Sequence, residues 1–259
     1  MNFWFLVILC LIQGLSEFLP ISSSGHLLLF ENILKIDGNL LLLNLFLHLA
    51  TLLAVVIVYR KVIWKLIKKP FQPLTYKLVV STLITLVFAF SYEIFGIDKY
   101  VGKIYGFCFL ITAVLLYSAY RFQKKASIVK VGEISYKSAC IVGLVQGFAV
   151  LPGISRSGST ISALMLCGND DGEAAEFSFL LSVPIIFGGF VFELIKIDDF
   201  SNVFSMVSPL MCVFAFVFTF LVSIVSLKVT LKMLKDRKFN YFAFYLIIVG
   251  IIAIILSFI

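Results

Sequence analysis

A cluster of chemically active side chains lies near the start of the chain, in the stretch "SEFLPISSSGH" at residues 16–26. The Glu17 carboxylate can accept a proton or bind a divalent cation, and a serine hydroxyl such as that of Ser23 can serve as a nucleophile. His26 adds an imidazole, which changes its charge near neutral pH. The surrounding sequence is strongly apolar, and ionisable groups in such surroundings are costly and usually functional. We therefore predict a functional site here, with a packing role as the alternative for His26.

A second polar stretch repeats the first. Residues 146–159, "QGFAVLPGISRSGS", align without gaps with residues 13–26, "QGLSEFLPISSSGH". The identities fall at the pairs Gln13/Gln146, Gly14/Gly147, Ile21/Ile154, Ser22/Ser155, Ser24/Ser157 and Gly25/Gly158. The second copy adds Arg156, whose planar guanidinium suits phosphate oxygens. The repeat predicts that both copies contribute to one site, with a structural ion pair between Glu17 and Arg156 as the alternative.

Each copy contains a break between two helical segments. Pro20 ends the first segment in one copy, and Pro152 with Gly153 ends it in the other. Serines follow each break and can cap the next helix. Two helix N-termini would then converge, and their free N–H groups favour anions. We expect a phosphate-containing ligand that is bound by Gln13, Ser22, Ser24, Gly25, Ser155, Ser157, Gly158 and Thr160.

Two more polar residues are expected next to this site. Gln146 is the counterpart of Gln13 in the repeat. His48, in "NLFLHLATLLA", is the second of the two histidines in the chain. The sequence leaves open whether His48 supports the binding residues from behind or only packs between helices.

The elements that hold these residues are expected to be membrane helices. The chain has 259 residues, of which 61% are hydrophobic and 14% charged, and its mean hydropathy is +1.10. A soluble domain of this length does not need so much apolar sequence, so the expected solvent is a bilayer. The five cysteines lie in apolar runs without CxxC or Cys/His spacing, which argues against a metal or disulfide framework.

Six apolar segments are long enough to cross a bilayer. They cover approximately residues 40–59, 77–95, 104–120, 176–195, 207–227 and 241–258. Basic loops at 60–77, 121–137 and 228–238 separate them, and positive loops stay on the cytoplasmic side. The net charge of +7 is therefore interpreted as a topology signal, and no nucleic-acid partner is expected. The remaining loops, 31–39, 91–103 and 193–206, then face outward.

The two polar copies lie outside these six segments. Each copy must enter and leave on one side of the membrane, but its arms are too short to cross, so a re-entrant hairpin fits better. The sequence predicts an all-α integral membrane protein with six transmembrane helices, two re-entrant helical hairpins and an inverted-topology repeat. The single membrane domain 1–259 comprises a first repeat at 1–125, with its hairpin at 3–35, and a second at 138–259, with its hairpin at 138–168.

These motifs resemble those of the bacitracin-resistance (BacA-type) family of undecaprenyl-diphosphate phosphatases. "QGLSEFLPISSSGHL" is similar to the first motif of the family and "LPGISRSGSTI" to the second, and "LHLATLLAV" and "EFSFLLSVP" are similar to other family stretches. The resemblance implies hydrolysis of undecaprenyl diphosphate to the monophosphate at the outer face of the bacterial plasma membrane. This reaction recycles the lipid carrier for peptidoglycan synthesis and confers bacitracin resistance. By position, Glu17, Ser23, His26 and Arg156 match the catalytic residues of the family.

The resemblance also suggests a mechanism. Arg156 and the hairpin N–H groups would hold the diphosphate, and Ser23 would be the nucleophile with His26 as its acid–base partner. Attack by water or by His26 itself stays open. Glu17, with Gln13 one turn before it, would position Mg²⁺ or Ca²⁺, or Glu17 would act as a base. The family often has glutamate where this chain has Gln13, so the metal site of the family is in question here.

The expected partners are a polyprenyl diphosphate lipid and the bilayer, and a homodimer is left open. One alternative function is a transporter or flippase for an anionic or polyprenyl-phosphate lipid, because inverted repeats around broken helices also serve alternating access. A purely structural membrane protein is a further alternative, but it would leave Glu17 and Arg156 without a role.

Overall fold

The structure is a computed structural model that describes residues 2–34, 40–96, 101–125, 133–195 and 208–258. Within these residues the chain is helical and contains no β-strand. The helices, in chain order, are α1 (Phe3–Ser16), α2 (Ser23–Leu34), α3 (Leu41–Val58), α4 (Arg60–Lys68), α5 (Pro73–Ile94), α6 (Val101–Lys125), α7 (Tyr136–Phe148), α8 (Arg156–Leu166), α9 (Asp171–Ile195), α10 (Pro209–Lys235) and α11 (Asn240–Leu256).

Long apolar helices account for most of the chain. By length and composition, α5, the Ile104–Lys124 part of α6, α9 and α10 can each cross a membrane. A fifth candidate is the pair α3–α4, which bends by 80° at its break, and α11 is apolar but shorter. The six predicted segments all fall on helices, and the protein is an all-α, multi-pass membrane protein. The predicted outward loops lie largely outside the described residues.

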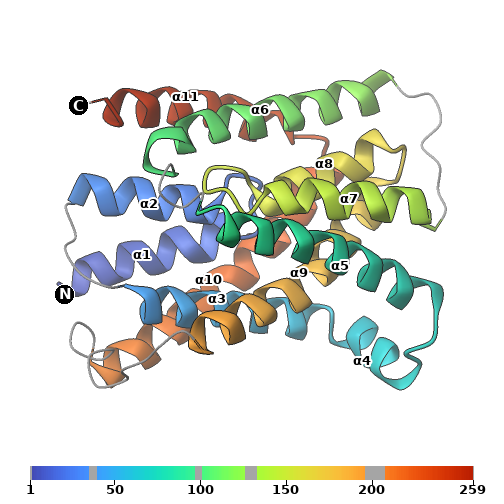
Figure 1. Ribbon diagram of the computed structural model, residues 1–259, viewed down its shortest axis with the longest axis horizontal. Helices are drawn as coiled ribbons and strands as arrows, with labels where there is room; N and C mark the ends of the chain where they lie inside the picture. The colour runs from blue at the N-terminus through green and yellow to red at the C-terminus, as the bar shows by residue number, and fades with distance from the viewer. Residues whose placement is uncertain (1, 35–39, 97–100, 126–132, 196–207, 259) are drawn as a thin grey trace.

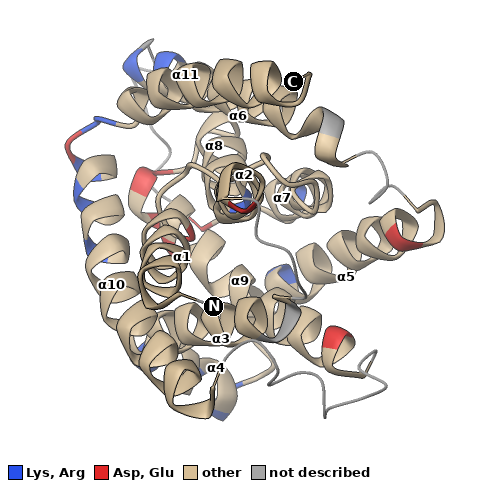
Figure 2. Cartoon of the chain, turned by 90° about the vertical axis from the view of Figure 1, so that its left-hand side faces the viewer, with Lys and Arg blue, Asp and Glu red and all other residues tan. Residues whose placement is uncertain are grey.

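Two pairs of short helices enter the bundle from opposite ends. Figure 1 shows α1 and α2 running in from the left and back, while α7 and α8 do the same from the right. The turns of both pairs, at 17–22 and 149–155, meet near the middle of the molecule (Figure 1). Viewed from the end of the bundle, α2, α7 and α8 lie inside, and α3, α5, α10 and α11 lie around them (Figure 2). This arrangement brings the two polar copies together, as the repeat predicts.

Hydroxyl groups tie the short helices to their long neighbours. From α5, Ser81 Oγ donates to the carbonyl oxygen of Ala139 at 2.7 Å, and Thr85 Oγ1 donates to that of Gly143 at 3.1 Å, both on α7. On the other side, Ser226 of α10 donates to the carbonyl oxygen of Leu15 near the end of α1. Such bonds between helices stabilise packing in a bilayer, where apolar contact alone gives little preference for protein over lipid.

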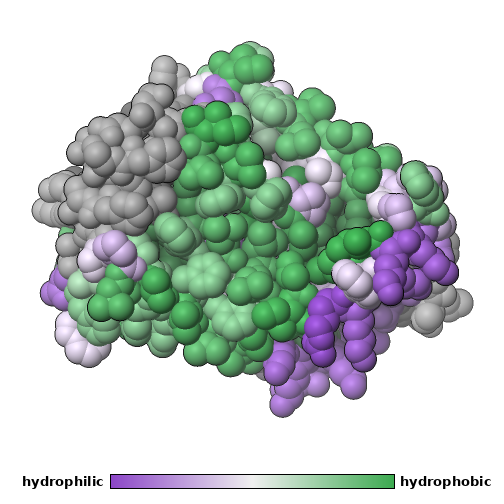
Figure 3. Space-filling model, turned by 90° about the horizontal axis from the view of Figure 1, so that it is seen from below, coloured by the Kyte–Doolittle hydropathy of each residue, from purple (hydrophilic) through white to green (hydrophobic). Residues whose placement is uncertain are grey.

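The outer surface is broadly apolar, as a bilayer requires. Figure 3 shows a wide hydrophobic face that is bordered by a hydrophilic patch at its right-hand end, the end at which α4 lies in Figure 1. Exposed aliphatic side chains recur one turn apart along α5 and α10, at Val79, Leu83 and Val87 and at Val213, Val217, Leu221 and Val225. Helices with such faces would expose far more apolar area to water than soluble proteins do, so these faces are lipid-facing.

Candidate active site

The site begins where the two hairpin turns interlock. Ser22 has a φ of 70°, and its hydroxyl oxygen accepts hydrogen bonds from the backbone N–H of Gly25 at 3.3 Å and of Gly153 at 3.1 Å. Gly153 has a φ of 94°, and a Cβ there would lie 2.3 Å from the carbonyl oxygen of Tyr105. A Cβ on Gly25 would lie 2.7 Å from the nitrogen of Gly153. The two glycines therefore let the turns approach closely, and Ser22 joins them.

Helix α8 starts at this junction and places Arg156. Ser155 precedes it, and its side chain caps the helix by accepting from the N–H of Gly158 at 3.1 Å. The N–H of Ser155 donates to Thr112 Oγ1 of α6 at 3.0 Å, which fixes the turn against a long helix. Arg156 is the first residue of α8, so its side chain leaves from the positive end of the helix dipole.

Glu17 is the centre of a buried polar network that spans both copies. One carboxylate oxygen, Oε1, pairs with the guanidinium of Arg156 from the second copy. The other, Oε2, accepts from Ser23 Oγ at 2.6 Å and from Gln13 Nε2 at 3.0 Å. The two copies therefore meet in one polar network, and the ion pair between Glu17 and Arg156, which the sequence left as the alternative, is present.

Two atoms of this network have unused hydrogen-bonding capacity. Arg156 Nη1 and Gln13 Oε1 are buried and have no hydrogen-bond partner among the described residues. Leaving a buried charged donor without a partner is costly, so such a group is usually explained by a ligand or water that completes it. The ion pair with Glu17 uses only one terminal nitrogen of Arg156, so it does not explain why the second one, Nη1, is buried without a partner among the described residues.

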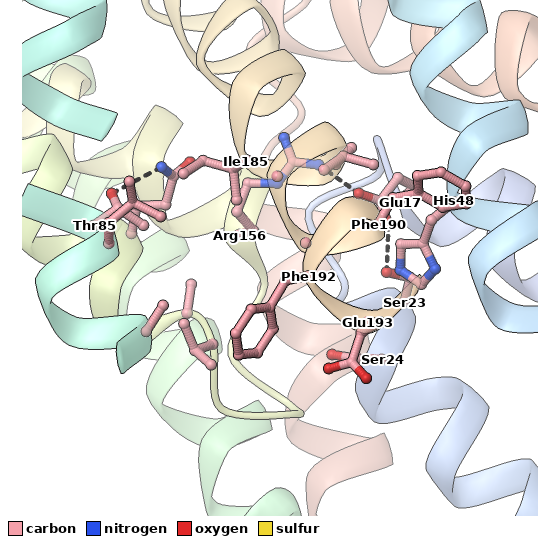
Figure 4. A pocket seen from close by; sticks show the side chains of 18 of the residues that line it. Glu17, Ser23, Ser24, His48, Thr85, Arg156, Ile185, Phe190, Phe192 and Glu193 are labelled. Atoms are coloured by element: carbon pink, nitrogen blue, oxygen red, sulfur yellow. Dashed lines mark hydrogen bonds and ion pairs between the residues drawn. The ribbon is translucent and has the colours of Figure 1, made fainter. Parts of the chain in front are cut away.

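A cavity of about 630 Å³ opens in front of this network. Its polar end is formed by Glu17, Ser22, Ser23, Ser24, His48, Thr85, Gln146, Ser155 and Arg156. Its other walls are mainly apolar and come from the C-terminal halves of α5 and α9, with Leu86, Phe90, Ile185, Phe190 and Phe192 among them. Figure 4 shows Arg156, Glu17 and Ser23 along one side of the cavity and Phe192 and Glu193 across from them. The cavity thus suits a molecule with an anionic head and an apolar tail.

The two histidines have different surroundings. His48 lines the cavity, and Figure 4 shows its ring pointing from α3 toward Glu17 and Ser23. Its Nδ1 is 2.7 Å from the carbonyl oxygen of Asn44, a distance at which Nδ1 is the donor and Nε2 is left as the acceptor. His26 is not among the lining residues: its Nδ1 is 2.8 Å from the carbonyl oxygen of Ser22, and its Nε2 is 2.8 Å from the hydroxyl of Tyr245.

The predicted ligand-binding residues divide in the same way. Ser22, Ser24 and Ser155 line the cavity, as does Gln146, which was expected only next to the site and whose Nε2 donates to Thr85 Oγ1 at 3.0 Å. The others lie behind this surface and hold the junction together: Gln13, Gly25, Ser157, Gly158 and Thr160. For example, Thr160 bonds to the carbonyl oxygen of Arg156 at 2.8 Å and to Ser178 Oγ at 2.6 Å. These residues position the site rather than face the cavity.

The apolar wall from α9 was not predicted from the sequence. Pro184 lies inside this helix, and Gly188 and Gly189 follow it and line the cavity. Nothing lies within 4 Å of where a Cβ on either glycine would be, so close helix packing does not explain them. The sequence does contain a signal for this wall, namely a proline followed by two glycines within one apolar helix. Glycine is unfavourable in a helix unless space or backbone freedom is needed.

The donors at this site fit a divalent cation only in part. No group of three or more His, Cys, Asp or Glu side chains among the described residues could hold a metal ion. Glu17 and the free Oε1 of Gln13 supply oxygen donors, and Mg²⁺ commonly uses one or two protein oxygens together with substrate phosphates. A cation shared with a phosphate ligand is therefore compatible with these residues, whereas a site made of protein ligands alone is not.

This arrangement is that of a multi-pass membrane protein that can hold an anionic group at the end of an apolar cavity. The model of the family described as "Bacitracin resistance protein BacA" matches residues 6–252. The chain belongs to this family.

Similar proteins cover the whole chain. A protein named undecaprenyl-diphosphatase from Halothermothrix orenii is 39% identical over 99% of both chains, and one from Carboxydothermus hydrogenoformans is 34% identical over 99% of this chain and 98% of its own. A protein named undecaprenyl-diphosphatase 4 from Bacillus thuringiensis is 38% identical over 100% of this chain and 98% of its own. The resemblance deduced from the motifs is confirmed.

Proposed function

We propose that this protein hydrolyses undecaprenyl diphosphate to undecaprenyl phosphate and inorganic phosphate. The family and the names of its relatives support this activity. The observation that carries the proposal in this chain is Arg156, which lines the polar end of an apolar cavity with Ser23 and Glu17 and whose buried Nη1 has no partner among the described residues. By this reaction the protein would recycle the lipid carrier of cell-wall synthesis, which is the basis of bacitracin resistance.

Binding would place the two parts of the lipid in the two parts of the cavity. The diphosphate would meet Arg156 Nη1 and the serine hydroxyls of both turns, which stabilise negative charge in a site of low dielectric. The polyprenyl chain would lie against the apolar walls of α5 and α9. Because both walls are helices that face lipid, the long chain can extend beyond the cavity into the bilayer.

Ser23 is the nucleophile in this proposal. Its hydroxyl already donates to Glu17 Oε2 at 2.6 Å, so the carboxylate can take the proton as Ser23 Oγ bonds to the terminal phosphorus. The bond from that phosphorus to the bridging oxygen breaks, and undecaprenyl phosphate leaves with the electron pair. Water then cleaves the phosphoserine and releases inorganic phosphate. Arg156 would pair with the phosphate oxygens instead of Glu17, and this frees the carboxylate for its role as a base.

His48 is assigned a role in proton transfer. It shares the cavity with Ser23 and Glu17, and its Nδ1 donates to the carbonyl oxygen of Asn44, which leaves proton exchange to Nε2. We therefore place the acid–base function, which the family resemblance assigned to His26, on His48. His26 would act indirectly, because its hydrogen bond to the carbonyl oxygen of Ser22 helps to fix the first turn. A divalent cation held by Glu17 and Gln13 would neutralise charge on the diphosphate when bound.

The orientation in the membrane is also part of the proposal. Basic residues gather at α4, at the end of α6 and at the end of α10, and positive ends stay in the cytoplasm. The cavity lies toward the C-terminal ends of α5 and α9, which Figure 1 shows at the other end of the bundle. Six crossings with two re-entrant hairpins, in repeats at 1–125 and 138–259, would then open the site to the outer face of the bacterial plasma membrane.

Phosphate release from undecaprenyl diphosphate by the purified protein in detergent tests this function. We expect Arg156→Ala to lower the rate by at least about 100-fold, the usual effect of losing a transition-state donor. Lys124→Ala, at the end of α6 and away from the cavity, is the matched control and should retain the rate. Normal release by Arg156→Ala would disprove the role of Arg156. Intact lipid that is translocated across liposomes would instead support a flippase.

A further inference from the structure

Helix α4 leaves the bundle as a separate amphipathic element. It follows α3 directly and is bent from it by 80°, so where α3 crosses the membrane, α4 lies nearly parallel to the membrane plane. Helix α4 lies at one end of the bundle, and the cavity lies toward the opposite end (Figure 1). The function of α4 is therefore not explained by the proposed catalytic site.

One side of α4 packs against the protein, and the opposite side is exposed. Val62, Ile63 and Leu66 pack against the hydrophobic core. By contrast, Trp64 is 59% exposed and Ile67 is 63% exposed. An aromatic and an aliphatic side chain that are exposed on a helix in the membrane plane match the boundary between headgroups and acyl chains.

The charged residues on the exposed side of α4, beside Trp64 and Ile67, are all positive. Arg60, Lys61, Lys68 and Lys69 are exposed, and Lys68 Nζ lies 5.2 Å from the centre of the Trp64 ring. Lys65 is also exposed, but it lines a smaller cavity together with Glu173 and Glu176, so it is set aside here. The sequence has no acidic residue between positions 59 and 92. The four remaining cations are exposed on the helix and at its end, and Arg60 Nη1 also donates to the carbonyl oxygen of Ile57 at 3.0 Å.

We propose that α4, with Trp64 at its centre, is a binding surface for the headgroups of anionic phospholipids in the leaflet next to it. Dispersed basic side chains beside exposed apolar ones attract anionic lipid near the membrane surface. The hydrophilic patch at that end of the apolar face matches this placement (Figure 3). The surface would anchor the bend between α3 and α5 and enrich anionic lipid around it.

The two tryptophans of the chain allow a direct test. Trp4, in α1, and Trp64 are the only ones, and Trp4 lies near the N-terminus, at the end away from α4 (Figure 1). Trp4→Phe leaves Trp64 as the single reporter, and Trp64→Phe leaves Trp4 as the matched control. Each variant is reconstituted into phosphatidylcholine vesicles that contain either brominated phosphatidylglycerol or brominated phosphatidylcholine, and quenching of fluorescence gives the relative association of the two lipids.

We expect Trp64 to favour phosphatidylglycerol about threefold at low salt, with a decrease at higher salt because the charges are exposed. Trp4 should show no preference. In the Trp4→Phe background, Lys61→Gln, Lys68→Gln and Lys69→Gln together should bring the ratio at Trp64 close to one, while phosphate release, measured in parallel, reports that the protein is folded. Equal quenching by both lipids at Trp64, or a preference that survives the three substitutions, would overturn the proposal.

Discussion

At the scale of single residues, Glu17 combines two kinds of contact that have different consequences. Its pairing with Arg156 neutralises a charge that the bilayer would otherwise disfavour, whereas its hydrogen bond with Ser23 would prepare that hydroxyl for attack in the proposed mechanism. Both contacts use the same carboxylate. A diphosphate that competes for Arg156 would therefore remove the ion-pair partner of Glu17 and leave its hydrogen bond with Ser23. The unpartnered Arg156 Nη1 is the atom that makes such competition favourable.

Chemical rescue separates the two histidines. We expect His48→Ala to lower phosphate release by about 100-fold, because general acid–base groups contribute about 10² to 10⁴. Added imidazole should restore part of this rate, because His48 borders a cavity that can admit a small molecule. His26→Ala should lower the rate through a displaced first turn, and imidazole should not restore it, because both ring nitrogens of His26 face protein groups. Rescue of His26→Ala with no effect at His48 would contradict this assignment.

At the scale of helices, the break in each hairpin and the composition of α9 decide what the cavity can hold. The proline breaks end α1 and α7 near the middle of the molecule, so polar side chains at the turns are surrounded by helices instead of lipid. Gly188 and Gly189 keep the α9 wall thin at the apolar part of the cavity. In the proposed function, this thin wall leaves room for the polyprenyl chain next to the polar end of the cavity.

A larger side chain at Gly189 should block the substrate without unfolding the helix. Gly189→Leu adds apolar volume to the cavity in a region where nothing lies within 4 Å, and leucine favours helices over glycine. If the lipid chain occupies this space, crowding of about 1–3 kcal/mol corresponds to a loss of about 5- to 150-fold in kcat/KM.

Gly102→Leu is the matched control for this substitution. It is the same change in a helical glycine with open space around it, at the start of α6 and outside the cavity. Phosphate release and thermal unfolding of both variants should be measured together. Unchanged kcat/KM in Gly189→Leu would show that the polyprenyl chain follows another route.

At the scale of the whole molecule, two halves of similar order meet around one site. In each half a broken pair of short helices precedes three longer helices, if α4 is counted as an extension of α3. The pairs enter from opposite ends (Figure 1), so one site receives Glu17 and Ser23 from one half and Arg156 from the other. Neither half carries the complete network.

Labelling of introduced cysteines tests the proposed orientation. In a variant without the five native cysteines, Lys69→Cys reports on the end of α4, and Phe258→Cys, at an 80% exposed position, reports on the C-terminal end. In intact cells, a maleimide that cannot cross the membrane should modify Phe258→Cys, while Lys69→Cys should react only after the cells are opened. The reverse pattern would place the cavity on the cytoplasmic side and exclude the proposed access from outside.

The sequence by itself determined the class of the protein and most of the site. Apolar segments, basic loops and helix breakers have local causes, so the membrane helices, the two polar copies and the residues Glu17, Ser23 and Arg156 could be recognised from residue types and spacing. The motifs also identified the family, because they are long and rich in uncommon polar residues.

Only the tertiary structure decided which polar side chains face the cavity. His26 and His48 cannot be ranked by spacing alone, since Tyr245 of the distant helix α11 holds the ring of His26, whereas His48 bonds within its own helix and lines the cavity. Likewise, the α9 wall belongs to the site because packing puts its C-terminal half next to α5 and the hairpin turns. Contacts between segments that lie far apart in the sequence form only when the whole chain folds, so they cannot be predicted from local residue patterns.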